Sequence, residues 1–502
     1  MRLYKRQHEI YQRLLSLFKQ SSAFNTYVLA GEMGVGKTYI ASRLTSDFSS
    51  AIVICPVNVV KKWQKVLAGF NNGNAPVVFS TSKKFDKEAF SHAKLKIVKK
   101  SQLSQFLSDS IYYDCIVNTD LLVVDEFHEY RIRQHGIHGA VDTSSTAYNL
   151  LNKVIGTQRT RNKKSTLLLT GTPFNQKYQE LLFQINLIYQ EYDSIYASYC
   201  YLQRQLFSPD FLLLFMRLIW QEIAVTVSIN EVEDATNLVN NEKIDQELKL
   251  EWLPMTGEQD AFYNLLRQTL STSERDGLLI SSFLDDPNQP LIKKKHRLTA
   301  VVANSPSDQI KIKLSQACNS LLGLKLLPIP FSQTNKFKRL LKILATRKRA
   351  IVIVENSNIQ QTLCQNLINK NINAGLLPKP LKKSEYAEWI NRAFNTGQLD
   401  VLIVKADDIS VGIDLNCVDT MIWYQLIDDV AKVLQTQRRI YRLNSSVSSQ
   451  VYYLVYKNTI QEELITQIAN ASRNNAATYG VQNTDPLAKL AGILLGDVKN
   501  EN

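Results

Sequence analysis

A glycine-rich turn near the start of the chain carries residue types that bind phosphate. Residues 31–38 read GEMGVGKT and fit the pattern G-x-x-x-x-G-K-T, between an expected strand at 26–30 and an expected helix. The glycines would let backbone N–H groups approach the phosphates. Lys37 would reach the β- and γ-phosphates of ATP, and Thr38 would supply a hydroxyl to Mg²⁺. The alternative is a chance glycine-rich turn, which the flanking strand and helix argue against. The residues expected to bind the nucleotide here are Gly31, Gly34, Gly36, Lys37 and Thr38.

Two adjacent acidic residues follow an apolar strand farther along the chain. Residues 121–128 read LLVVDEFH. Asp125 would hold Mg²⁺, directly or through water, and Glu126 is placed to polarise the attacking water. A solvated strand end is the alternative for such a pair alone, but the upstream turn favours the catalytic interpretation. His128 fits a structural histidine and a functional one equally well.

The elements that would position these residues are short apolar strands alternating with helices. Their continuous apolar runs predict strands covered on both faces, as in parallel sheets with helices on either side. Candidate strands are Thr26–Ala30, Ala51–Cys55, Pro76–Ser80, Leu95–Val98, Leu121–Val124 and Thr166–Leu169, then Ala350–Val354, Asp400–Val404, Thr420–Tyr424 and Gln450–Val455. From about residue 176 to 327 the patterns are mostly helical, so we expect an insertion or connection there rather than a further sheet.

Several short segments resemble one family. Residues 125–128, DEFH, resemble the DExH box of superfamily-two helicases, and residues 167–173, LLLTGTP, resemble that superfamily's motif III in its Swi/Snf form. Cys55-Pro56 followed by Trp63 resembles the Swi/Snf motif Ia. The resemblance implies roles in nucleic-acid contact or coupling for a set of residues. These are His128, Trp63, Thr170, Gly171, Thr172 and, in a later segment, Gln435.

The N-terminal segment adds one more expected nucleotide contact. Residues 2–7, RLYKRQ, resemble the element of this family whose glutamine contacts adenine. The resemblance therefore nominates Gln7. The alternative is a surface residue on a first helix.

A basic segment in the second half distinguishes this family from kinases and transporter ATPases. Residues 435–442 read QTQRRIYR and resemble motif VI, QxxxRxxR. On a helix, Gln435, Arg439 and Arg442 would share one face. Two guanidinium groups could then be aimed at a γ-phosphate held by the other lobe, where they would stabilise charge in the transition state. A solvated basic helix face is the alternative, but it does not explain the preceding buried strand.

The segment before motif VI extends the resemblance. Residues 410–415, SVGIDL, resemble motif V, in which a glycine and an aspartate couple nucleic-acid contact to the ATP cleft. Gly412 and Asp414 would therefore belong to the site. The resemblance covers roughly residues 1–190 and 330–470. Residues 406–409, ADDI, depart from the usual Thr and Gly pair, and Arg442 is followed by Leu-Asn rather than Ile-Gly-Gln.

The resemblance implies an α/β fold of two tandem RecA-like P-loop domains with a helical insertion between them. We expect an N-terminal ATP-binding lobe at 1–180, a helical insertion and inter-lobe connection at 181–327, a C-terminal lobe at 328–475 and a tail at 476–502. The compact, Lys/Asn/Ile-rich chain is similar to phage or mobile-element helicases. Protein partners would bind through the helical insertion.

The charge balance favours a polyanionic partner. Lys plus Arg outnumber Asp plus Glu by 59 to 46, a formal net charge of +13. Such an excess favours nucleic acid, although solubility alone is the alternative. Three basic clusters could contact phosphates: Lys94/Lys96/Lys99/Lys100, Arg159/Arg161/Lys163/Lys164 and Lys293/Lys294/Lys295/Arg297.

The apolar segments and the cysteine spacing bear on the location of the chain and on whether it binds zinc. The start, MRLYKRQHEI, has no apolar core of a signal peptide, and no apolar stretch is long enough to span a bilayer. We therefore expect a cytoplasmic location, in a bacterium or a phage-infected cell, and no membrane partner. No two of the six cysteines lie within four residues of each other, which argues against a zinc site.

The expected function is an ATP-dependent motor that moves on DNA. Swi/Snf-type motifs imply tracking along double-stranded DNA without full strand separation. One alternative is a strand-separating replication helicase of a phage or plasmid. Another is a non-catalytic nucleic-acid-binding module, against which the catalytic set argues. That set is Lys37, Asp125, Glu126, Arg439 and Arg442.

Overall fold

The computed structural model describes the two sheet-containing regions of the chain and a few short segments between them. The described residues are 1–20, 25–32, 34–80, 82, 85–130, 146–157, 164–171, 187–188, 220–221, 223–227, 232, 238–239, 242–243, 246–257, 259–260, 263–264, 318, 331–381, 385–410, 415, 417–427, 429–441 and 448–478. Within these ranges, every helix is too short or too polar to cross a membrane.

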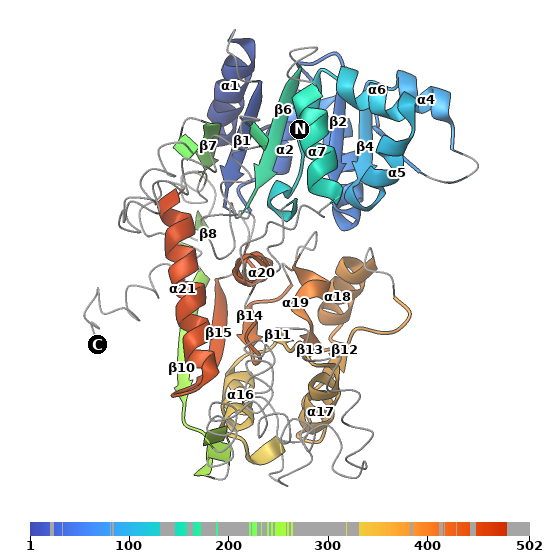
Figure 1. Ribbon diagram of the computed structural model, residues 1–502. Coiled ribbons are helices and arrows are strands. Elements are labelled where there is room, and N and C mark those ends of the chain that lie inside the picture. The colour runs from blue at the N-terminus through green and yellow to red at the C-terminus, as the bar shows by residue number, and fades with distance from the viewer. Residues whose placement is uncertain are drawn as a thin grey trace, which may run out of the picture.

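The N-terminal lobe is built on a seven-stranded sheet in the order β3-β4-β2-β5-β6-β1-β7, and all its neighbouring strands are parallel (Figure 1). Parallel strands place all their carboxyl ends at one edge of the sheet. The strands are β1 (Thr26–Gly31), β2 (Ala51–Cys55), β3 (Val77–Val78), β4 (Leu95–Lys99), β5 (Leu121–Val124), β6 (Ser165–Thr170) and β7 (Ala224–Val227).

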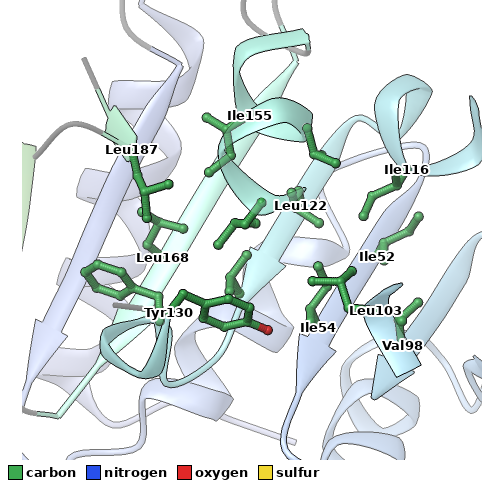
Figure 2. Close-up of a cluster of buried hydrophobic side chains, with 14 of the residues drawn as sticks. Ile52, Ile54, Val98, Leu103, Ile116, Leu122, Tyr130, Ile155, Leu168 and Leu187 are labelled. Atoms are coloured by element: carbon green, nitrogen blue, oxygen red, sulfur yellow. The ribbon is translucent and has the colours of Figure 1, made fainter. Parts of the chain in front are cut away.

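Helices cover both faces of this sheet, so side chains that alternate along each strand are buried in two separate cores. In β1, Val28 packs in one hydrophobic cluster and Leu29 in the other. Figure 2 shows the first cluster, in which Leu122 and Leu168 of the central strands meet Ile155 of α7. The helices are α1 (Lys5–Lys19), α2 (Lys37–Thr45), α3 (Val60–Phe70), α4 (Lys87–His92), α5 (Leu103–Ser108), α6 (Ser110–Asn118) and α7 (Thr146–Thr157).

The C-terminal lobe repeats this plan with a six-stranded parallel sheet in the order β10-β15-β14-β11-β13-β12. Its strands are β10 (Gln246–Leu253), β11 (Ala350–Ile353), β12 (Ala374–Leu376), β13 (Val401–Val404), β14 (Thr420–Trp423) and β15 (Ser449–Tyr456). Its helices are α16 (Asn335–Thr346), α17 (Ser357–Ile368), α18 (Tyr386–Asn395), α19 (Ala406–Ile409), α20 (Val430–Gln437) and α21 (Ile460–Thr478). Helix α20 lies on the side of this lobe that faces the N-terminal lobe (Figure 1).

The predicted fold class is confirmed: the chain has two tandem α/β lobes of the RecA-like type, each with a parallel sheet. Each of the ten predicted strands overlaps an observed one, and the predicted strand Pro76–Ser80 shrinks to the two residues of β3.

The expectation that residues 176–327 form an insertion or connection rather than a further sheet is wrong, because the described part of this region contributes four strands. β7 pairs with β1 at the edge of the first sheet, and β10 pairs with β15 at the edge of the second. β10 reads QELKLEWL, with polar residues between apolar ones, because an edge strand is only half covered. A short antiparallel hairpin of β8 (Leu238–Val239) and β9 (Glu242–Lys243) lies between them in sequence. The domain boundaries at 180, 327 and 475 stay a prediction.

A buried lysine braces the start of α16. Lys336 is 1% exposed, and its Nζ donates to the carbonyl of Tyr424 at 2.8 Å. The amine also lies over the rings of Tyr424 and Tyr456, at 5.5 and 5.2 Å from their centroids. Burial lowers the pKa of Lys336 to about 7, and the nearby Cys318 opposes this only in part.

This lysine should make stability rise with pH. In the unfolded chain a lysine has a pKa of about 10.4. Between pH about 7 and about 10 the unfolded chain therefore binds one more proton than the folded chain, so the free energy of unfolding increases with pH. Urea unfolding of Lys336→Met should show a flatter increase over that window than the wild type. Lys342→Met, which changes an exposed lysine on the same helix, should keep the wild-type slope. Equal slopes for wild type and Lys336→Met would contradict the assignment.

Candidate nucleotide site at the junction of the lobes

The glycine-rich turn joins the carboxyl end of β1 to the first turn of α2. Gly34 and Gly36 have φ angles of 94° and 85°, a backbone conformation that favours glycine. Gly36 caps α2, so the unpaired N–H groups of the first helical turn, which contains Lys37 and Thr38, are available to an anion. Lys37 Nζ donates to the carbonyls of Gly31 and Glu32, at 2.7 and 3.1 Å. These bonds hold the ammonium group within the turn, where a phosphate would bind.

Gln7 of α1 packs directly on this turn. Its Nε2 donates to the carbonyl of Val35 at 2.8 Å, and its Oε1 accepts from the N–H of Tyr4 at 3.1 Å. A Cβ atom at Gly36 would lie 2.4 Å from Gln7 Nε2. Gln7 is 3% exposed, so the alternative of a surface residue is wrong. Its contact with adenine stays a prediction.

Asp125 and Glu126 follow β5 at the same edge of the sheet, and both are buried. Burial raises the pKa of Asp125 to about 6, because the charge of Glu126 adds to the desolvation and Trp63 and Lys37 only partly offset it. Burial also raises the pKa of Glu126, against the charges of Lys37 and Arg439 and a hydrogen bond from the N–H of Gly171. The site therefore holds two carboxylates that need positive charge around them.

Glu126 has the geometry of a group that can accept a proton. Its backbone is left-handed, with φ 50° and ψ 49°, a conformation that is uncommon for a residue other than glycine. Among the described residues no donor satisfies its Oε2, and His128 Nδ1 lies 3.5 Å away. A buried carboxylate oxygen with spare lone pairs is what activation of a water requires.

Asp125 is held in place by two hydrogen bonds. Its Oδ1 accepts from the N–H of Glu126 at 3.0 Å, and its Oδ2 accepts from Trp63 Nε1 at 2.8 Å. Trp63 lies on α3 and is 1% exposed. In this arrangement Trp63 contacts the candidate metal ligand and is too deeply buried to contact nucleic acid directly.

His128 joins three predicted motifs and both lobes. Its Nδ1 is 3.0 Å from Thr170 Oγ1 at the end of β6, and its Nε2 is 3.3 Å from Gln435 Nε2 on α20. An amide nitrogen can only donate, so His128 Nε2 accepts, and the ring proton on Nδ1 is available to Thr170. These contacts place His128 between the two lobes, and its functional role stays a prediction.

Arg439 lies beside the same site, but not on the helix face that the spacing predicts. α20 ends at Gln437, and Arg438 and Arg439 lie beyond it, so the expected helix face shared by Gln435 and Arg439 is wrong. Arg442, the third member of that expected face, lies outside the described residues. Tertiary bonds accompany this helix end: the carbonyl of Gln437 accepts from Gln246 Nε2 at 2.8 Å, and the carbonyl of Arg439 accepts from the N–H of Leu415 at 3.1 Å. They satisfy carbonyl groups that the helix leaves without a partner at its end.

The guanidinium of Arg439 is fixed by the segment that resembles motif V. Its Nε donates to the carbonyl of Ser410 at 2.9 Å, and its Nη2 donates to the same oxygen. Arg439 is 5% exposed, and its charge lowers the pKa of Glu126 against the larger effect of burial. A residue of the C-terminal lobe thus acts electrostatically on Glu126 of the N-terminal lobe.

Tyr441 is a contact between the lobes that the sequence did not reveal. This C-terminal-lobe residue is 2% exposed and belongs to the hydrophobic cluster of the N-terminal lobe. The one sequence feature that could have indicated this contact is an aromatic residue within the basic segment 435–442. Tyr441 and Gln435 therefore hold the segment that carries Arg439 from both sides.

Two family models match the chain, one on each lobe. The model described as "Type III restriction enzyme, res subunit" matches residues 1–175, and "Helicase conserved C-terminal domain" matches residues 335–444. Each match contains the predicted motifs of its lobe. The chain belongs to the superfamily-two helicases. A solved structure of the Sulfolobus solfataricus SWI2/SNF2 ATPase core in complex with dsDNA is similar at 16% identity and a TM-score of 0.38, covering 97% of this chain and 96% of that one. A likeness that weak adds nothing to the assignment.

Four of the helicase site residues predicted from the sequence lie outside the described residues. These are Thr172, Gly412, Asp414 and Arg442. Thr170 and Gly171 are described, and both contact the DEFH segment, Thr170 through His128 and Gly171 through Glu126.

The predicted basic clusters look different in three dimensions. Lys96 is 5% exposed and its Nζ donates to the carbonyl of Ala93, so it is not available to a phosphate. Lys100 and Lys164 form ion pairs of 2.5 Å with Glu129 and Asp120. The cluster at residues 293–297 lies outside the described residues.

The contact between Gly36 and Gln7 yields a prediction. Gly36→Ala should lose nucleotide binding and stability, because a Cβ at φ 85° is strained by about 1–2 kcal/mol and would also clash with Gln7 Nε2. Gly397→Ala is the matched control, since Gly397 has φ 70° but a Cβ added there would meet no atom within 4 Å. Thermal unfolding and fluorescent-nucleotide titration would measure both. Equal behaviour of the two variants would refute the proposed contact.

The link between His128 and Gln435 yields a second prediction. In a double-mutant cycle on ATP turnover, His128→Ala and Gln435→Ala should be non-additive by about 0.5–3 kcal/mol, because each removes the same inter-lobe bond. His128→Ala with Gln365→Ala, a glutamine on the outer helix α17, is the control cycle and should be additive. Additivity in both cycles would show that the bond does not contribute to turnover.

Proposed function

We propose that this helicase-family chain is an ATP-dependent motor that moves along DNA, with ATP bound between its two lobes. One observation carries the proposal: Glu126 of the first lobe, which interacts with Lys37 and Asp125, also lies within electrostatic reach of Arg439 from the second lobe. Hydrolysis of ATP would then depend on how the lobes sit relative to each other. Such dependence is what a motor needs to couple chemistry to movement.

The donor set of the site fits Mg²⁺. Magnesium prefers oxygen ligands and is commonly bound by one or two carboxylates together with the phosphates of a substrate. Asp125 is a buried carboxylate whose two oxygens each accept one hydrogen bond and keep further lone pairs, and Thr38 offers a hydroxyl at the start of α2. Asp125 and Thr38 would hold the ion, which neutralises charge on the phosphates when it is bound.

The chain's own residues would divide the remaining work. Lys37 would leave the carbonyls of Gly31 and Glu32 for the β- and γ-phosphates, and the N–H groups of the turn would bind the phosphate oxygens. Glu126 would orient the attacking water and accept its proton. Arg439 would stabilise the charge that develops on the γ-phosphate.

Double-stranded DNA is the proposed track. The supporting features are the excess of positive charge and the Swi/Snf form of the LTGTP segment. Strand separation is the alternative outcome on the same track. The motor is proposed to follow the duplex without opening it.

ATPase assays with duplex DNA, single-stranded DNA and RNA test this proposal. Duplex DNA should stimulate turnover most, and the stimulation should fall steeply with salt because it depends on phosphate contacts. A triplex-displacement assay should be positive where a strand-displacement assay is negative. If no nucleic acid stimulates turnover, the proposed motor function is wrong. If the chain displaces a strand, it is an unwinding helicase and not a translocase that leaves the duplex closed.

Active-site variants test the chemistry in the same assay. Lys37→Ala should nearly abolish turnover, whereas Glu126→Gln should still bind ATP and turn over poorly because an amide is not a base. Arg439→Ala should slow turnover by a factor on the order of 10³ while weakening nucleotide binding far less. Lys342 lies on α16, far from the site, so Lys342→Ala should behave as wild type. Unchanged turnover in Arg439→Ala would restrict catalysis to the N-terminal lobe.

A further inference from the structure

Trp63 differs from the other deeply buried tryptophans of the described chain in what its indole N–H does. Trp63, Trp220 and Trp423 are each less than 2% exposed. The indole nitrogens of Trp220 and Trp423 find no hydrogen-bond partner among the described residues, whereas Trp63 Nε1 donates to Asp125 Oδ2 at 2.8 Å. Packing alone therefore explains the burial of Trp220 and Trp423, but Trp63 has a specific polar contact in addition.

The position of Trp63 on α3 makes this contact rigid. Val60, Val66 and Leu67 bury the same face of α3 in the core of the N-terminal lobe. β2 precedes α3, and β5, which ends just before Asp125, is the strand next to β2 in the sheet. Helix and carboxylate are thus anchored to neighbouring strands, and the buried indole has little room to leave Asp125 while α3 stays in place.

The contact fixes the orientation of the carboxylate. Asp125 Oδ1 is held by the N–H of Glu126 and Oδ2 by the indole, one bond to each oxygen. The carboxylate plane is therefore set, and the lone pairs that remain point in defined directions. An indole N–H is a donor only, so Trp63 cannot ligate a cation itself and can act on one only through Asp125. Hydrogen bonds that orient a metal ligand in this way commonly affect metal affinity by about 10- to 100-fold.

We propose that Trp63 is a positioning residue for the divalent cation: its indole N–H holds Asp125 in the orientation that binds Mg²⁺ with ATP. This inference rests on the proposed ATP-dependent function. It gives Trp63 a role on the metal side of the site, inside the protein, instead of a direct contact with nucleic acid. Loss of the indole N–H lowers the affinity for the cation and leaves the other proposed catalytic residues in place.

The test measures cation binding directly in the full-length chain. Mn²⁺ serves as the probe, and its binding in the presence of a non-hydrolysable ATP analogue is followed by electron paramagnetic resonance. Trp63→Phe should bind Mn²⁺ about 10- to 100-fold more weakly than the wild type. Trp423→Phe is the matched control, because it shortens an equally buried tryptophan whose N–H is not bonded within the described chain, and it should keep the wild-type affinity.

Steady-state kinetics give a second readout that packing alone would not change. For Trp63→Phe the Mg²⁺ concentration at half-maximal ATPase rate should rise by the same factor, while kcat at saturating Mg²⁺ returns close to the wild-type value. Replacement of Trp63 by benzothienylalanine keeps the ring shape and removes only the N–H. This variant separates the hydrogen bond from packing if Trp63→Phe does not fold, and it should show the same loss of Mn²⁺ affinity.

The outcomes separate this inference from the proposed function. Wild-type Mn²⁺ affinity in the benzothienylalanine protein, or in a folded Trp63→Phe, would overturn the positioning role and leave the motor function intact. A wild-type protein that binds no Mn²⁺ with the ATP analogue would overturn both. A selective loss of Mn²⁺ affinity in the Trp63 variants, with Trp423→Phe unchanged, supports the role.

Discussion

Two carboxylates buried on consecutive residues constrain the whole site. Asp125 and Glu126 repel each other, and burial raises the pKa of both. Ionised carboxylates in such a place need cationic partners or strong hydrogen bonds. The first lobe supplies Lys37, Trp63 and the N–H of Gly171, and the second lobe supplies Arg439. Groups from both lobes are therefore needed to offset the negative charge of Asp125 and Glu126, and a bound divalent cation would offset it further.

The parallel sheet is what allows so many groups to converge. β1, β6 and β5 are neighbours, so the glycine-rich turn, Thr170 and the acidic pair all follow the carboxyl ends of adjacent strands. His128 then spans from Thr170 to Gln435 of the other lobe. A displacement of either strand end or of α20 would change the same set of contacts. The geometry supports a site that senses the relative position of the lobes.

Much of the fold could be predicted because its signals are local. The glycine pattern at 31–38 marks the turn in which Gly34 and Gly36 adopt positive φ angles, and apolar runs mark ten of the described strands. β10 was not predicted, because the mixed polar and apolar residues of an edge strand do not stand out from the neighbouring sequence. The early end of α20 was not predicted either, and the carbonyls at and beyond that end are satisfied by Gln246 and Leu415, which the local sequence does not indicate.

The site residues show the same division between local and tertiary information. Motif spacing identified Lys37, Asp125 and Glu126, whose positions depend on a strand and the turn that follows it. The bond from Trp63 to Asp125 and the burial of Tyr441 in the other lobe depend on packing between distant segments, and no spacing encodes them. Sequence motifs thus named Trp63 and the candidate reacting groups, but not the contact between Trp63 and Asp125.

The contacts between the lobes that His128 and Tyr441 make are individually modest. A hydrogen bond such as that from Gln435 to His128 contributes a net 0.5–1.5 kcal/mol or so, and full burial of an aromatic side chain such as Tyr441 contributes roughly 1.5–3 kcal/mol. Contacts of this size bias the lobes toward closure without fixing it. In the proposed cycle the γ-phosphate would add the missing attraction by binding Lys37 from one side and Arg439 from the other. Its loss on hydrolysis would leave only the modest contacts, so the lobes could separate and the chain could advance.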